Sequence, residues 1–153
     1  MHSKMIAFLA TGFGSGRLPG AKGTYGTLVA IPISLLFSRL APIPFLVTLV
    51  TLIVLAVWVA HQMVAITGEK DPQSVVIDEI VGYLVSMALL PHSLGFMALA
   101  FALFRVCDTV KFWPIKWLEK NLKGGMGIVM DDVAAGLFVQ IMIRGLISWV
   151  GGV

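Results

Sequence analysis

Five runs of apolar residues, separated by short polar stretches, dominate the pattern along this chain. They cover residues 26–40, 45–67, 75–90, 94–107 and 131–150. The run 45–67 carries no formal charge and is long enough to cross a bilayer as a helix, which needs about 20 apolar residues. The other runs are short for a complete span, so one membrane helix can be interrupted or re-entrant. Residues 26–40 either cross the membrane or enter and leave it on the same side. The pattern predicts an all-α, polytopic membrane helical bundle with about four to five membrane-embedded helices.

The composition also places the chain among integral membrane proteins. Of its 153 residues, 58% are hydrophobic and 12% are charged, and the mean hydropathy is +0.96. Soluble domains have about 45–50% apolar and about 25% charged residues. The length suits one domain, so we predict a single membrane domain over residues 1–153. The net charge of +3 is modest, and we expect membrane lipid as a partner and no nucleic acid.

The positions of the basic residues predict how the chain is oriented in the membrane. Four lysines lie in residues 111–123, and loops rich in lysine tend to remain in the cytoplasm. Alternating helices then place a Gly-rich loop, 1–25, and an interfacial segment, 111–130, on the cytoplasmic side. The interfacial segment combines lysines with tryptophans, which suits the headgroup region. The same alternation brings all eight carboxylates to this side, although lysines alone define the orientation.

Five of these carboxylates fall at predicted helix ends. Asp78 and Glu79 open one helix, Asp108 closes the next, and Asp131 and Asp132 open the last. Interaction with helix dipoles would explain acids at N-termini but not Asp108, because an acid is unfavourable at a C-terminus. If the three ends meet, the like charges repel one another unless a cation neutralises them. Oxygen ligands without cysteine suit Mg²⁺, so the sequence predicts one or two Mg²⁺ ions here.

Two further polar residues accompany the acids. Arg105 lies three residues before Asp108 on the same helix face, and it can either pair with that acid or bind a phosphate. His61 lies near the inner end of its helix, at the predicted depth of the site. It is either a packed, hydrogen-bonded side chain or a participant in catalysis.

The N-terminal loop contains six glycines between Gly12 and Gly26, together with Arg17 and Lys22. Its spacing matches neither the dinucleotide-binding pattern GxGxxG nor the P-loop pattern GxxxxGK[ST]. Bare backbone N–H groups beside two cations suit an anion-binding nest. A packed irregular loop is the alternative for this segment.

Five motifs follow one another along residues 12–136. They read "GFGSGRLPGAKGTYGTL", "AHQ", "DPQSVVIDEIVG", "FRVCDTVKFWPIKW" and "KGGMGIVMDDVAAG". In content and order they resemble the phosphatidylglycerophosphatase A family. The chain departs from the family at Leu18, where Ser is frequent, and at Lys22, where Pro is usual. The resemblance implies an Mg²⁺-dependent enzyme that hydrolyses the terminal phosphate of phosphatidylglycerophosphate, an anionic phospholipid, to give phosphatidylglycerol in phospholipid biosynthesis.

The resemblance implies metal-site roles for the five acids, and the residue patterns described above suggest the remaining roles. We expect the metal to be held by Asp78, Glu79, Asp108, Asp131 and Asp132. We expect catalytic roles for His61, Asp78, Glu79 and Asp108, and substrate binding by Lys22, Thr24, Arg105 and Lys111. The favoured mechanism is attack by a metal-activated water, with an Asp or His61 as the base.

These features predict a multi-pass protein of the bacterial inner membrane, with its active site on the cytoplasmic side. A divalent-cation transporter or channel is the alternative, because intramembrane acids also mark ion pathways. Transporters place such acids near the middle of the bilayer and often have repeated halves. Acids gathered at one side of the membrane favour the enzyme.

Overall fold

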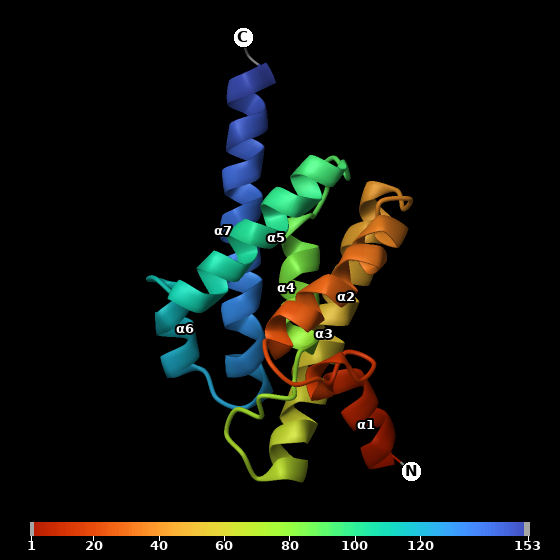
Figure 1. Cartoon of the computed structure of the whole chain (residues 1–153), viewed down its shortest axis with the longest axis vertical. Coiled ribbons are helices and arrows are strands. Elements are labelled where there is room, and N and C mark those ends of the chain that lie inside the picture. Colours follow the sequence, from red (N-terminus) through yellow and green to blue (C-terminus); the bar gives the residue numbers. More distant parts are fainter. Residues whose placement is uncertain (1, 152–153) are drawn as a thin grey trace.

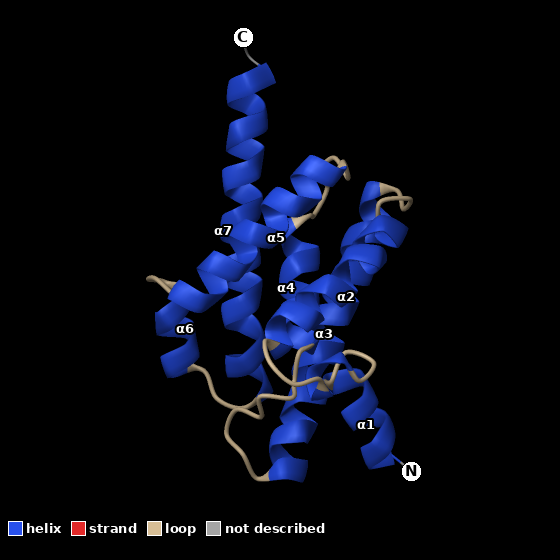
Figure 2. Cartoon of the chain, in the orientation of Figure 1, coloured by secondary structure: helices blue, strands red, loops and turns tan. Residues whose placement is uncertain are grey.

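The computed structural model describes residues 2–151, and every regular element in that range is helical (Figures 1 and 2). The elements are α1 (His2–Ala10), the 3₁₀ turn η1 (Ser15–Arg17), α2 (Lys22–Phe37), α3 (Pro42–Thr67), α4 (Ile77–Ser86), α5 (Leu94–Val110), α6 (Ile115–Asn121) and α7 (Gly125–Gly151). The predicted all-α class is therefore confirmed.

Among the described residues, two helices are long and apolar enough to cross a membrane, α3 with 26 residues and α7 with 27. At 1.5 Å per residue each is about 40 Å long, which exceeds the bilayer core of about 30 Å. In each helix only 28% of the most apolar 18 residues are buried, whereas the core helix of a soluble protein would be largely covered. The helices α2, α4 and α5 have 16, 10 and 17 residues. The count of four to five membrane-embedded helices therefore stays a prediction.

The short helix α4 forms the centre of the bundle. Every residue from 80 to 87 is buried, which is typical of a helix that is apolar on all sides and surrounded by others. Two glycines permit this close packing. A Cβ at Gly82 would meet the Phe104 ring at 2.6 Å, and one at Gly136 of α7 would overlap the carbonyl oxygen of Gly82.

Several helix boundaries differ from those predicted. Part of the segment 1–25, predicted as a Gly-rich loop, forms α1, because Ile6 and Ala10 are buried in the core. The last helix begins at Gly125 rather than 131, so its start lies inside the predicted interfacial segment 111–130. Asp131 and Asp132 consequently lie in the second turn of α7 and do not open it. The prediction was wrong here because the start of α7 is glycine-rich, and glycines are usually helix breakers.

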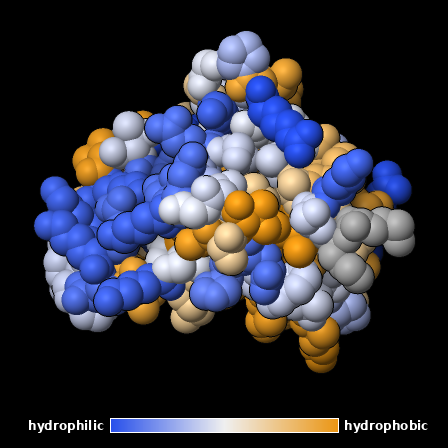
Figure 3. All heavy atoms as spheres, turned by 90° about the horizontal axis from the view of Figure 1, so that it is seen from below, coloured by the Kyte–Doolittle hydropathy of each residue, from blue (hydrophilic) through white to orange (hydrophobic). Residues whose placement is uncertain are grey.

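The polar connections lie at one end of the bundle, the lower end in Figure 1. The α3–α4 and α6–α7 connections are both found there, while α7 extends to the opposite end. Viewed from below, this end is hydrophilic over much of its surface, with hydrophobic residues near the centre and along part of the rim (Figure 3). The chain directions therefore agree with the predicted alternation.

Candidate functional site

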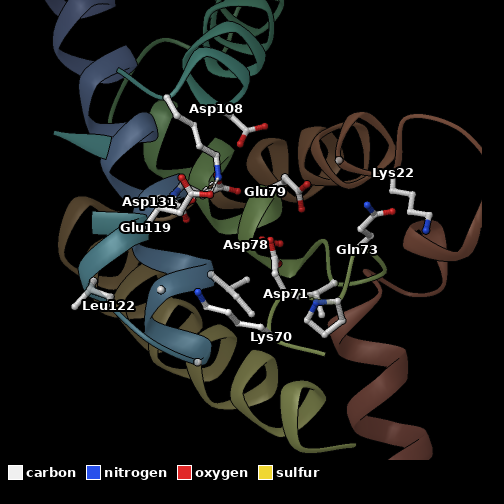
Figure 4. Close-up of a pocket in the computed structure, with 18 of the residues that line it drawn as sticks. Lys22, Lys70, Asp71, Gln73, Asp78, Glu79, Asp108, Glu119, Leu122 and Asp131 are labelled. Carbon is white, nitrogen blue, oxygen red and sulfur yellow. Dashed lines mark hydrogen bonds and ion pairs between the residues drawn. The ribbon is translucent and has the colours of Figure 1, made fainter. Parts of the chain in front are cut away.

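A cavity at this end of the bundle collects most of the predicted site residues (Figure 4). Its volume is about 400 Å³, which lies in the range of small-ligand sites. The walls come from the start of α2, the α3–α4 loop, the start of α4, the end of α5, α6 and the first turns of α7. The charged wall residues are Lys22, Lys70, Asp71, Asp78, Glu79, Asp108, Lys111, Glu119, Asp131 and Asp132. Seven carboxylates thus face three lysines.

Three of the carboxylates form a compact cluster. Asp78 and Glu79 occupy the first turn of α4, and Asp132 comes from the second turn of α7 and is only 4% exposed. Each offers an oxygen within 4.8 Å of the others. Asp78 Oδ1 and Glu79 Oε2 are buried and have no hydrogen-bond partner among the described residues. Buried carboxylates without partners are costly, so this cluster fits a bound cation of the hard, oxygen-liganded kind.

Asp131 lies next to the cluster but has a cationic partner. Lys111 Nζ donates to Asp131 Oδ2 at 2.8 Å and to Glu119 Oε1 at 3.1 Å. The other oxygen of Asp131 accepts the backbone N–H of Asp132 at 3.0 Å. The chain Lys111–Asp131–Asp132 therefore fixes the backbone at the residue that carries the third cluster carboxylate.

Lys111 reaches these acids because of its backbone conformation. It caps α5 with a left-handed φ of 44°, so the chain turns and α6 folds back beside α7. Burial lowers the pKa of Lys111, but hydrogen bonds and charge attraction to Asp131 and Glu119 outweigh this effect and raise it above the ordinary value. Lys111 is therefore a permanent cation in the cavity wall at neutral pH.

Asp108 lies in the last turn of α5 and is paired within its own helix. Arg105 Nη1 donates a hydrogen bond to Asp108 Oδ2 at 2.6 Å, so the two side chains form an ion pair. The same guanidinium lies against Gly23, where a Cβ would come within 2.8 Å of Nη1 and would overlap Glu79 Oε1. The absence of a side chain at position 23 thus lets Glu79 and Arg105 approach the start of α2.

The structure brings some predicted residues to the cavity and leaves others outside it. Lys22 and Lys111 line it with the five predicted acids, whereas Arg105, Thr24 and His61 are not among its walls. Thr24 is half-buried in the first turn of α2. His61 is exposed on α3, and its ring lies 2.8 Å from the position of a Cβ on Gly124. It therefore contacts the α6–α7 connection, behind the cavity wall.

Four polar wall residues were not predicted, and one of them is Asp71 of the α3–α4 connection. Lys70 and Gln73 come from the α3–α4 connection and Glu119 from α6. In Figure 4, Lys22 and Lys70 lie on different sides of the Asp78 side chain. No sequence signal marks these residues, because "GEKDPQ" has the composition of any polar turn and the segment around Glu119 resembles any exposed helix.

Comparisons with known proteins agree on one family. The family model described as phosphatidylglycerophosphatase A matches residues 8–147. The chain is 36% identical to the phosphatidylglycerophosphatase A of Escherichia coli K12, over 94% of this chain and 81% of that protein. It is 35% identical to the phosphatidylglycerophosphatase A of Haemophilus influenzae, over 94% and 90%. A putative phosphatidylinositol-3-phosphatase of Bacteroides thetaiotaomicron is 40% identical over 98% of both chains. No solved structure matches the chain.

Proposed function

The chain belongs to the phosphatidylglycerophosphatase A family, and we propose that it removes the terminal phosphate of phosphatidylglycerophosphate, an anionic phospholipid. The products are phosphatidylglycerol and inorganic phosphate, and the reaction serves phospholipid biosynthesis. As a member of this family the protein is a phosphatase. The cluster of Asp78, Glu79 and Asp132 in a cavity at one end of the bundle is the observation that carries the proposal.

Mg²⁺ is the cofactor that we propose for this cavity. Seven carboxylates and three lysines give the walls a formal charge of −4, that is, 3 − 7. Such walls repel a phosphate unless a cation is bound among them. We assign the cation to Asp78, Glu79 and Asp132, where two buried oxygens have no hydrogen-bond partner in the described part of the chain. When bound, Mg²⁺ supplies positive charge that polarises the phosphoryl group and offsets the charge of the walls.

Asp108 is the residue that we assign to proton transfer. It lines the cavity outside the three-carboxylate cluster, and Arg105 holds its Oδ2. In the proposed step a water oxygen forms a bond to phosphorus while the bond from phosphorus to the glycerol oxygen breaks. Asp108 accepts the proton of the water, and the departing glycerol oxygen takes a proton from solvent. Arg105 acts as a positioning residue for Asp108, so Arg105→Lys should cost less activity than Asp108→Asn.

The cytoplasmic side of a bacterial inner membrane is the location that we propose for the site. Lys70 and Lys111 line the cavity, and the α3–α4 connection that carries Lys70 lies at the lower end of the bundle in Figure 1, which supports this orientation. Cysteines introduced at exposed Lys70 and at exposed Arg39, in the α2–α3 connection, should be labelled from opposite sides of the membrane. The native Cys107 is buried and gives little background. Labelling of both positions from one side would exclude the proposed topology.

A second substrate deserves a direct test because of the Bacteroides relative, whose printed name is that of a phosphatidylinositol-3-phosphatase. That name describes a lipid with a phosphodiester and a phosphomonoester in its headgroup, as in phosphatidylglycerophosphate. We rank phosphatidylglycerophosphate first because the family model and two relatives carry its name. The divalent-cation transporter or channel is the remaining alternative, and the position of the acids at one end of the bundle counts against it.

The deciding experiment measures phosphate release by the purified protein in mixed micelles. The substrates are phosphatidylglycerophosphate, phosphatidylinositol 3-phosphate and phosphatidic acid, each with Mg²⁺ or with EDTA. We expect rapid release from the first lipid, restored after EDTA by added Mg²⁺. Phosphate release from phosphatidylinositol 3-phosphate alone would show that this lipid is the substrate. Full activity in EDTA would show that the reaction needs no metal. Absence of release from all three lipids would refute the proposal.

A further inference from the structure

A second hollow, distinct from the acidic cavity, lies between α1, η1 and the end of α3. It has a volume of about 490 Å³ and is lined by Ser3, Lys4, Ala7, Phe8, Arg17 and Ile66. These residues belong to three segments that are far apart in the sequence. None of them lines the acidic cavity. Figure 1 shows α1 at the lower end of the bundle, which also carries the polar connections.

The charge of this hollow is opposite to that of the acidic cavity. Two cations, Lys4 and Arg17, line it, and no carboxylate does. Over residues 2–151 neither cation takes part in an ion pair, since the ion pairs found there involve Arg105 and Lys111. Both side chains are exposed. Two cations without an ion-pair partner in the described part of the protein therefore border the hollow.

The remaining walls are largely apolar and uncovered. Phe8 is 51% exposed and Ile66 is 49% exposed, and Ala7 lies beside them. Met5 and Phe13 add exposed hydrophobic surface at 55% and 56% on the same N-terminal segment. A ligand that suits this surface carries a negative group for the cations and a hydrocarbon part for the apolar side chains.

We propose that this hollow binds an anionic phospholipid of the cytoplasmic leaflet, at a site separate from the one that performs hydrolysis. Basic pockets between helices on the cytoplasmic side are suited to anionic headgroups. The phosphate lies between Lys4 and Arg17, and one acyl chain follows Phe8 and Ile66. Charge complementarity selects this occupant over a neutral lipid. The proposal rests on the proposed orientation, in which this end of the bundle faces the cytoplasm. It does not depend on which lipid is hydrolysed in the acidic cavity.

Native mass spectrometry of the purified protein in detergent with EDTA can count bound lipids. We expect one phosphatidylglycerol to be retained more tightly than phosphatidylcholine. Lys4→Gln with Arg17→Gln should weaken its binding by about 30-fold, since each cation near an anionic lipid contributes about 1 kcal/mol. Lys116→Gln with Lys120→Gln, which removes two exposed charges of α6 at the same end, is the matched control and should leave the tight site intact.

The same variants separate this site from the acidic cavity. Phosphate release in micelles should persist in the Lys4/Arg17 variant, because neither residue lines the acidic cavity, and that activity also reports correct folding. Conversely, Asp132→Asn should keep the tightly bound phosphatidylglycerol. Equal losses in the Lys4/Arg17 variant and the α6 control would mean general surface attraction and overturn the proposal. Loss of the lipid in Asp132→Asn would place it in the acidic cavity and overturn it equally.

Discussion

The two halves of α7 have the same secondary structure but opposite surroundings. Residues 125–136 include nine buried positions, among them Asp131 and Asp132. Residues 137–151 are mostly exposed and apolar, with Leu137 at 51%, Ile141 at 64% and Trp149 at 74%. Charges in the first half are enclosed by other helices, while the second half presents hydrocarbon to its surroundings. The contrast shows that one apolar helix can form a wall of the acidic cavity at one end and expose apolar side chains at the other.

Polar side chains in the outer half of α7 also contact other parts of the protein. Gln140 and Arg144 donate hydrogen bonds to the carbonyl oxygens of Ala88 and Leu89, at 3.4 and 3.5 Å. These carbonyls lie just beyond the end of α4, where no further helical turn supplies a donor. Polar side chains of α7 thus point toward the protein in both halves, and they satisfy backbone groups in one and build a site in the other.

The largest effect is expected from the cluster in the inner half. Asp132→Asn and Asp78→Asn should each lower phosphate release on the order of 1000-fold, or about 4 kcal/mol, because each removes a charged ligand from the proposed metal site. Thermal unfolding in detergent without Mg²⁺ should show equal or higher stability, since like-charge repulsion falls. Glu119→Gln, at the rim of the same cavity, is the control and should retain most activity. Near-normal turnover in both cluster variants would refute the metal site.

The second largest effect is expected from differences in packing between the two halves of α7. Gly136→Ala places a Cβ against the backbone oxygen of Gly82 and 3.0 Å from Val85 Cβ, so we expect a loss of about 3 kcal/mol in the free energy of unfolding. On the outer half, the new Cβ of Gly145→Ala meets no described residue within 4 Å apart from its chain neighbours and its own helix backbone. This variant should gain up to about 1 kcal/mol from helix propensity. Denaturant unfolding of both variants measures the difference. Equal effects would mean that the inner half is not closely packed.

Lys111 should give a smaller and pH-dependent effect. Lys111→Gln leaves buried Asp131 without its cation and should cost about 1.5 kcal/mol of stability. The raised pKa of Lys111 stabilises the fold fully below its unfolded value of 10.5, and this contribution is lost as the pH rises through the folded value. The stability difference between wild type and variant should therefore be constant from pH 6 to about 9 and shrink above about 10.5. A difference that instead disappeared on acidification to pH 6 would contradict the ion-pair account.

The sequence predicted the class of fold and the gathering of the five acids, but it predicted the ends of the helices less accurately. The helices that carry Asp78 and Asp108 were predicted, and α5 begins at the predicted residue 94, because proline and polar turns mark these limits. The end of α4 was placed four residues late, at 90 instead of Ser86. The start of α7 was placed six residues late, since glycines at 124, 125 and 127 imitate a loop. Two of these glycines are required by packing instead, because a Cβ on Gly124 or Gly125 would press against His61 or its backbone. Local propensity carries no information about such contacts.

What the sequence by itself determined was the membrane class, the family and the set of acids that could meet at one side. These follow from hydropathy, from motif order and from the placement of lysines, which are all properties of the linear chain. Tertiary structure alone decided how the acids divide: Asp78, Glu79 and Asp132 form a cluster, Asp108 pairs with Arg105, and Asp131 pairs with Lys111. It also placed His61 outside the cavity and Lys70 inside it. The physical reason is that charge pairing acts over a few ångströms, and only the packing of α4 against α7 and the turn at Lys111 set those distances.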